Sequence, residues 1–149
     1  MLPDRPAPRS VVSAQTPEPE MTTPVRTATV LLEHTLPDGS AHLDWLIERP
    51  ADPAEHRMIT FRCDSDPMDH APWAGERLPD HRAHYIRYEG PVSGNRGRVR
   101  RLWSHPCTLH AAEAHRLHLT IHIAEDRSLH LRAAPDDPAR WHRTDPDSD

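Results

Sequence analysis

Hydrophobic and polar residues alternate with a period of two through the middle of the chain. In the clearest run, apolar and polar side chains take turns from Leu117 to Ile123. Residues 129–131 repeat the alternation, and further short strands are predicted at residues 27–32, 41–48, 58–62 and 98–103. This pattern is typical of antiparallel strands with one buried face. We therefore expect an all-β, mainly antiparallel fold, either a barrel or a sandwich.

Turn-forming sequences separate most of the predicted strands. Pro37-Asp38-Gly39 and Gly94-Asn95-Arg96-Gly97 favour tight turns, because Gly and Asn tolerate a left-handed backbone and Pro fixes φ. Helix is favoured only weakly, at residues 107–115 and 79–85, and each segment suits a short helical turn. The expected fold is therefore all-β with short helical turns.

The two ends of the chain lack sustained hydrophobic periodicity. Residues 1–26 are rich in Pro, Ser, Thr and Glu, and residues 135–149 are rich in Pro and Asp. Such compositions are typical of disordered tails, in which we expect only Trp141 and His142 to touch the domain. Since 149 residues suit one ordinary domain, we predict a single domain over residues 27–134.

Cysteine usage and hydropathy indicate the cellular setting. Cys63 and Cys107 are far apart and form no Cys-x-x-Cys spacing, so neither a disulfide framework nor a zinc knuckle is indicated. No stretch approaches the roughly 18 apolar residues of a membrane span, and the N-terminus lacks a signal-peptide pattern. We therefore expect a reduced, cytoplasmic protein that does not enter a membrane.

Charge is unevenly distributed along the chain. The formal net charge of −5 argues against a wholly cationic nucleic-acid-binding surface. Residues 77–101 nevertheless contain seven Arg and two acidic residues, a local charge of +5. Arg98 and Arg100 lie two apart in a predicted strand, so both face one side and suit a nucleic-acid backbone. A solvated strand face is the alternative interpretation.

His42 and Asp44 are the first candidates for chemistry. They lie two apart in a predicted strand, so both project from one face while Leu43, Trp45 and Ile47 supply the apolar opposite face. His34 ends the preceding predicted strand and can reach the same point across the intervening turn. Two His and one carboxylate suit a divalent metal with open positions for water and substrate. Because the chain has 13 His, a solvated strand face is the competing interpretation.

Two motifs together resemble a known family. Leu32-Glu33-His34 followed by His42-Leu43-Asp44-Trp45-Leu46-Ile47-Glu48 resembles the H…H-x-D-x-x-x-E pattern of the 3′-phosphoesterase domain of bacterial DNA ligase D. Further on, Asp80-His81-Arg82-Ala83-His84-Tyr85-Ile86-Arg87-Tyr88-Glu89-Gly90 is similar to the D-H-x-x-x-Y-x-x-[FY]-E-G stretch of that family. The resemblance covers residues 28–104, with the motifs in the family's order.

This resemblance implies a fold, a metal and a reaction. The fold would be a small closed β-barrel in which His34, His42 and Asp44 bind Mn²⁺, with Zn²⁺ or Co²⁺ as alternatives. His81 and Tyr85 would contact the scissile phosphate as catalytic residues. The implied substrates are nucleic-acid 3′ ends bearing a phosphate or a ribonucleotide, as in DNA repair. Ligase D often fuses this domain to polymerase and ligase domains, so separate ligase or repair proteins are the expected partners of a monomer here.

One position departs from the family pattern. The family has an Arg two residues after the metal-binding Asp, where this chain has Leu46. A guanidinium there would make a charge-assisted contact with phosphate and stabilise developing charge. Either Arg77, Arg96 or Arg98 fills the place, or the protein is a catalytically weak or inactive module that binds nucleic-acid ends or a phosphorylated ligand. A cupin-like metal barrel is a third interpretation, but the Gly-rich paired His/Glu motifs of that class are absent from the sequence.

Overall fold

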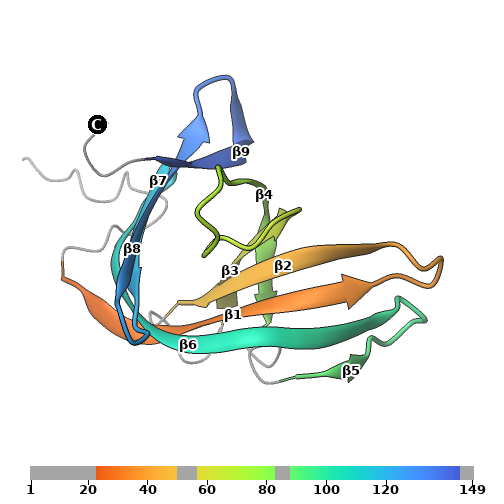
Figure 1. The fold of residues 1–149 in the computed structure, drawn as a ribbon. Coiled ribbons are helices and arrows are strands. Elements are labelled where there is room, and N and C mark those ends of the chain that lie inside the picture. The colour runs from red at the N-terminus through yellow and green to blue at the C-terminus, as the bar shows by residue number, and fades with distance from the viewer. Residues whose placement is uncertain (1–22, 50–56, 83–87, 145–149) are drawn as a thin grey trace, which may run out of the picture.

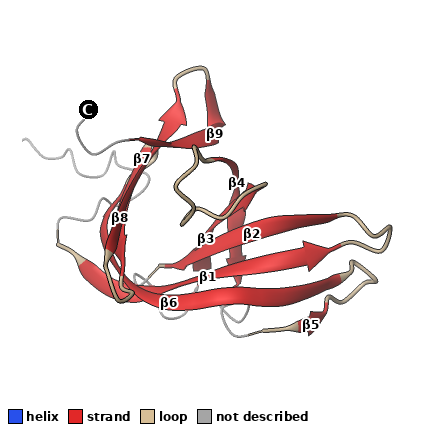
Figure 2. Ribbon diagram, viewed as in Figure 1, coloured by secondary structure: helices blue, strands red, loops and turns tan. Residues whose placement is uncertain are grey.

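The computed structural model describes residues 23–49, 57–82 and 88–144, and these ranges form strands and turns without a helix (Figure 2). In chain order the strands are β1 (Val25–Thr35), β2 (Ala41–Glu48), β3 (Arg57–Cys63), β4 (Ala74–Arg82), β5 (Gly90–Pro91), β6 (Arg98–Ala112), β7 (Arg116–Ile121), β8 (Arg127–Ala134) and β9 (Asp137–Thr144). They pair antiparallel in the order β1-β2-β3-β4-β9-β8-β7-β6-β5. Because β6 also pairs with β1, eight strands close into a barrel and β5 is an additional strand beside β6 (Figure 1). The predicted all-β barrel is confirmed.

The barrel interior is filled by the apolar positions of the period-two pattern. Aromatic rings from separate strands and from the loop between β3 and β4 meet there. Phe61 contacts Trp73 and Trp141 edge to face, with ring centroids 5.6 and 5.5 Å apart. Leu31, Leu119 and many other aliphatic side chains surround these rings and are fully buried. Burial of each large apolar side chain contributes about 1.5–3 kcal/mol, so this interior is the main source of stability.

A second hydrophobic cluster lies on the outer face of β1, β2, β3 and β6. It consists of the buried side chains Val30, Leu32, Leu46, Met58 and Val99, against which Tyr88 and Val92 pack. Alternate residues of a strand face opposite sides, so these side chains point away from the barrel interior. The segment around β5 therefore covers part of the outer wall, and this wall has apolar packing on both faces.

The structure corrects the expected helical turns and the expected C-terminal boundary. Residues 107–115, expected to include a helical turn, instead form the end of β6 and the turn that follows it, with Cys107 and Leu109 buried. The other expected helical turn, at 79–85, begins inside β4, and its residues 83–85 lie outside the described part. β9 occupies residues assigned to the C-terminal tail, and its Trp141 is buried in the core.

Residues 1–22 and 145–149, which belong to the predicted tails, lie outside the described part of the chain.

Cys63 and Cys107 are buried free thiols, and burial raises the pKa of each to about 12. Both therefore remain protonated and serve as packing residues. No helix that is long and apolar enough to cross a membrane occurs in the described residues.

Candidate metal centre

The hairpin of β1 and β2 brings the three predicted metal ligands together. A hydrogen bond of 2.7 Å from Leu36 N to Ser40 O closes its turn. The resulting register places His34 directly opposite His42, and Asp44 follows two residues later on the same face. The turn lies at the end of the molecule away from β7, β8 and β9 (Figure 1).

The side chains of His34, His42 and Asp44 converge on one point. His34 Nδ1 lies 3.8 Å from Asp44 Oδ2, and His42 Nε2 lies 3.4 Å from Asp44 Oδ1. One ligand atom from each residue falls within 4.8 Å of the other two. Asp44 is buried, and the imidazoles are half-buried. The geometry therefore assembles the predicted ligand set at the surface end of a buried strand pair.

His34 is held in place by a backbone carbonyl from the turn before β6. Its Nε2 lies 2.7 Å from Arg96 O, which can only accept a hydrogen bond, so Nε2 carries the proton. This tautomer leaves the lone pair of Nδ1 facing Asp44. Gly97 allows the close approach of the two segments, since a Cβ there would lie 2.0 Å from Thr35 O. In metal sites, the nitrogen of a ligating imidazole that does not bind the metal usually donates a hydrogen bond to a carbonyl or carboxylate, which fixes the orientation of the ring.

His42 has a buried nitrogen that makes no hydrogen bond. Its Nε2 is inaccessible to solvent and has no hydrogen-bond partner among the described residues. Burial is the largest cause that lowers the pKa of His42, and the negative charge of Asp44 acts in the opposite direction. The positive charges of Arg62 and His34 lower this pKa further. A buried polar atom without a hydrogen-bond partner costs stability, so such an atom indicates a site where a bound ligand supplies the missing partner. A neutral imidazole nitrogen beside a buried carboxylate fits a divalent cation.

Leu46 is a packing residue in this structure. It is fully buried in the outer hydrophobic cluster, next to Leu32 and Met58, and lies two residues beyond Asp44 on the same face. Apolar side chains thus surround the position at which the pattern of the ligase D phosphoesterase domain has an Arg. A guanidinium that serves the site has to come from another strand.

Arg77 lies on the other face of the barrel wall. Its guanidinium carbon is 5.7 Å from the ring centroid of Phe61 and 5.6 Å from that of Trp141, both interior residues. Its Nη2 also lies 3.7 Å from Asp80 Oδ1. Arg77 therefore closes the end of the hydrophobic core and does not face His42 and Asp44.

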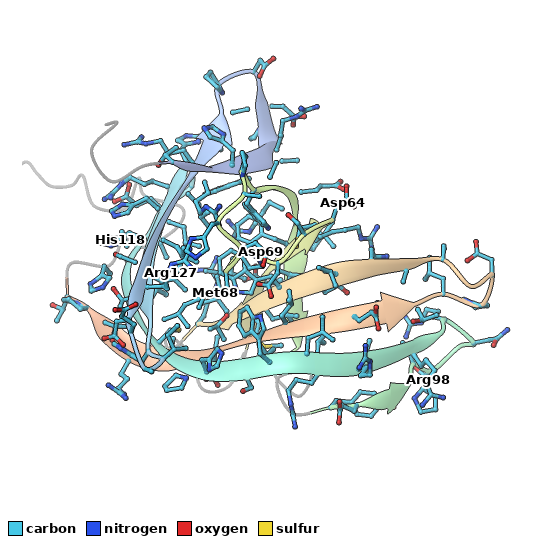
Figure 3. All side chains as sticks on the ribbon, in the orientation of Figure 1. Asp64, Met68, Asp69, Arg98, His118 and Arg127 are labelled. Atoms are coloured by element: carbon cyan, nitrogen blue, oxygen red, sulfur yellow. The ribbon has the colours of Figure 1, made fainter. Side chains whose placement is uncertain are left out.

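Arg98 and Arg100 also face away from the ligand cluster. They flank buried Val99, which pairs with His34, so alternation turns both guanidinium groups to the opposite side. Arg100 Nη2 lies 3.0 Å from Glu33 Oε1, and Arg98 is exposed at the end of β6 beside β5 (Figure 3). The predicted basic strand face exists, on the other side of the sheet from the metal ligands.

Arg96 contributes its backbone to the site and its side chain to the local turn. Nε of Arg96 donates to Ser93 O at 2.6 Å, and Nη2 donates to Ser93 Oγ at 3.1 Å. Its carbonyl is the group that holds His34. This role is invisible in the sequence, because any residue type offers a carbonyl.

Arg62 neighbours the site and was missed by sequence reasoning. It lies on β3 directly opposite Asp44, and its positive charge contributes to the lowered pKa of His42. Directly paired residues of an antiparallel ladder project from the same face. The sequence gives no signal for this pairing, since the register between two strands is set by long-range pairing that a local pattern does not contain.

The second family-like motif has clear structural contacts at its two ends. Asp80 Oδ2 accepts a hydrogen bond of 2.7 Å from Arg49 Nε, which ties β4 to the end of β2. Glu89 Oε2 accepts a hydrogen bond of 2.8 Å from Arg101 N, and Gly90 has a φ of +126°, where a side chain is strained. The Glu-Gly pair thus anchors the segment that covers the outer cluster.

The two predicted catalytic residues are only partly placed. The backbone of His81 pairs with Met58, which belongs to the outer cluster, and the position of its side chain lies outside the described structure. Tyr85 falls in residues 83–87, also outside the described part.

Comparisons with models of known protein families and with characterised proteins gave no match to this chain.

Proposed function

We propose that this protein is a metal-dependent phosphoesterase that processes nucleic-acid 3′ ends bearing a phosphate or a ribonucleotide, as in DNA repair. The observation that supports it most is the cluster of His34, His42 and Asp44, whose potential ligand atoms lie within 4.8 Å of one another. The buried, unbonded Nε2 of His42 and the fixed tautomer of His34 both suit a cation at this point. Mn²⁺ is the cation favoured by the family resemblance, with Zn²⁺ or Co²⁺ as alternatives.

Each residue of the cluster has a defined part in this proposal. His34 and His42 supply neutral nitrogen ligands, and Asp44 supplies the negative charge that balances part of the cation's charge. A bound divalent cation would polarise a phosphoryl oxygen and lower the pKa of a bound water. By the family resemblance, His81 would protonate the leaving 3′ oxygen or bind a phosphate oxygen as imidazolium, and Tyr85 would donate a hydrogen bond to the same phosphate.

The basic strand face would serve a different part of the substrate. Arg98 and Arg100 lie on the opposite side of the sheet from Asp44, where Arg98 is exposed and Arg100 is bound to Glu33, so Arg98 suits nucleotides remote from the scissile phosphate. Separate ligase or repair proteins would act on the processed end.

Release of phosphate or of a terminal ribonucleoside from a 3′-modified primer tests this proposal. We expect turnover with Mn²⁺, none with chelator, and loss of turnover in His42→Ala. His142→Ala is the matched control, because His142 is exposed on β9 and remote from the cluster. Equal turnover in His42→Ala and in the unmodified protein would remove the catalytic assignment.

A binding module is the second candidate, and the burial of Leu46 favours it. Without a guanidinium at that position, the site has less support for charge developing on a transferred phosphoryl group. In that case the protein would bind both Mn²⁺ and a 3′-phosphorylated oligonucleotide without turnover. Binding with turnover would exclude this candidate.

A further inference from the structure

Four residues form one row across the outer face of the sheet. Arg101 pairs with Leu32, Leu32 pairs with Asp44, and Asp44 pairs with Arg62, on β6, β1, β2 and β3 in turn. Direct partners in an antiparallel sheet have Cβ atoms about 4.5–5.5 Å apart. Arg62 is therefore the arginine immediately beside the buried carboxylate of the metal cluster, on the same face.

Most arginines of the described ranges are engaged in structural contacts, and Arg62 is not. Arg49 and Arg77 bind Asp80, Arg100 binds Glu33, and Arg143 binds the backbone carbonyls of Pro67 and Ala71. Arg62 is exposed, and its guanidinium makes no hydrogen bond or ion pair with the residues that the structure describes. An arginine without a structural partner beside a ligand cluster is available to bind an anion.

The neighbourhood of Arg62 explains why it stays unpaired beside two acidic residues. Asp44 directs its oxygens toward His34 and His42, and Glu76, the partner of Arg62 on β4, is exposed. A cation held by the cluster would use the charge of Asp44. The guanidinium of Arg62 would then offer two parallel N–H donors at the edge of the site, which is the arrangement that binds phosphate oxygens.

We infer that Arg62 is the phosphate-binding arginine of this site and takes the place that Leu46 leaves without a guanidinium. The inference deepens the proposed function and depends on it, since it assigns a phosphate group to the open side of the metal. In comparison with the family pattern, the guanidinium would come from the facing position on β3 instead of from β2, the strand of the ligands. Leu46 is then free to pack in the outer cluster.

Binding of Mn²⁺ and of inorganic phosphate, measured separately, tests the inference. Mn²⁺ affinity is measured by calorimetry, and phosphate binding by the relaxation of its ³¹P signal near protein-bound Mn²⁺. Arg62→Ala should hold Mn²⁺ at least as tightly as the unmodified protein, because a nearby positive charge is removed. It should bind phosphate about 10- to 100-fold more weakly, the usual effect of losing a charge-assisted hydrogen bond. Arg62→Lys should recover part of the loss, since it keeps the charge and loses the paired donors.

Arg140→Ala is the matched control. Arg140 is exposed and lies in the continuation of the same row, paired with Glu76 on the far side from Arg62. It should bind Mn²⁺ and phosphate as the unmodified protein does. If Arg62→Ala binds Mn²⁺ and phosphate normally, the role of Arg62 is overturned while the metal site stands. If the unmodified protein binds no Mn²⁺, the proposed function fails and the role of Arg62 fails with it.

Discussion

His34 and His42 present different nitrogens to the same carboxylate. His34 uses Nδ1 because its Nε2 is bonded to Arg96 O, whereas His42 uses Nε2. The difference follows from their positions, since the carbonyl of a neighbouring turn fixes the orientation of the His34 imidazole, whereas Nε2 of His42 is buried beside Asp44. The site at this scale therefore depends on a backbone carbonyl as much as on its three side chains.

Gly97→Ala should weaken the metal site without touching a ligand. Gly97 has a φ of +94°, and a Cβ there would meet Thr35 O at 2.0 Å, so the turn that carries Arg96 O must move away from His34. We expect about a 10- to 100-fold loss of Mn²⁺ affinity, the usual cost of disturbing the second layer of a metal site. Calorimetric titration with Mn²⁺ measures it.

Gly39→Ala separates the clash at Gly97 from simple backbone strain. Gly39 has a similar φ of +92°, but a Cβ there would meet nothing within 4 Å. Both variants should lose about 1–2 kcal/mol of stability from the left-handed backbone, and only Gly97→Ala should lose metal affinity. Equal metal affinities in the two variants would contradict the role given to Arg96 O.

Strands with regular alternation were predicted well, and strands interrupted by charge or proline were not. β2 has the predicted bounds, Ala41–Glu48, because the apolar residues Leu43, Trp45 and Ile47 recur at every second position. β4 and β9 were missed, since Pro79 and Pro138 interrupt sequences rich in charged residues. Both strands are specified by their partners in the closed barrel, a long-range effect that a local pattern does not contain.

The end of β6 shows how a bulge hides a strand. The register with β7 shifts between Leu109 and Ala111, so Ala111 and Ala112 are both buried and the alternation is lost. A run of small and apolar residues with broken alternation resembles a helical turn, which is the reason for the wrong prediction at residues 107–115.

Three histidines on adjacent strands form a stack on the outer wall far from the metal site. His118 on β7 stacks on His110 of β6 and His130 of β8, with ring centroids 4.4 and 3.9 Å apart. Figure 3 shows His118 at the side of the molecule opposite Arg98. Burial, and then the positive charges that His130 and His110 can carry, lower the pKa of His118 to about 4.

This stack should make stability depend on pH. Unfolded His118 has a pKa of 6.5, so below that pH the unfolded chain binds a proton that the folded protein does not take up. The contribution of neutral His118 to stability is complete above pH 6.5 and is lost as the pH falls toward 4. Urea denaturation at pH 7 and pH 5 should show a smaller loss in His118→Gln than in the unmodified protein. The same loss in both proteins would show that His118 does not contribute, and His142→Gln, at an exposed histidine, serves as the control.

At the scale of the whole molecule, barrel closure is what builds the site. The β1–β6 pairing brings the turn with Arg96 O to His34, and the β2–β3 pairing brings Arg62 to Asp44. The sequence contained the ligand set, because His42 and Asp44 share a strand and His34 lies one hairpin turn away. It did not contain Arg62 or the Arg96 carbonyl, since both depend on how separate strands align.

A calorimetric titration with Mn²⁺ tests most directly whether His34, His42 and Asp44 bind one divalent cation. The unmodified protein should bind one Mn²⁺ per chain. His42→Ala and Asp44→Asn should each lose that binding while keeping their circular dichroism spectra, because neither side chain belongs to an apolar cluster. Unchanged binding of Mn²⁺ by both variants, or no binding by the unmodified protein, would contradict the account.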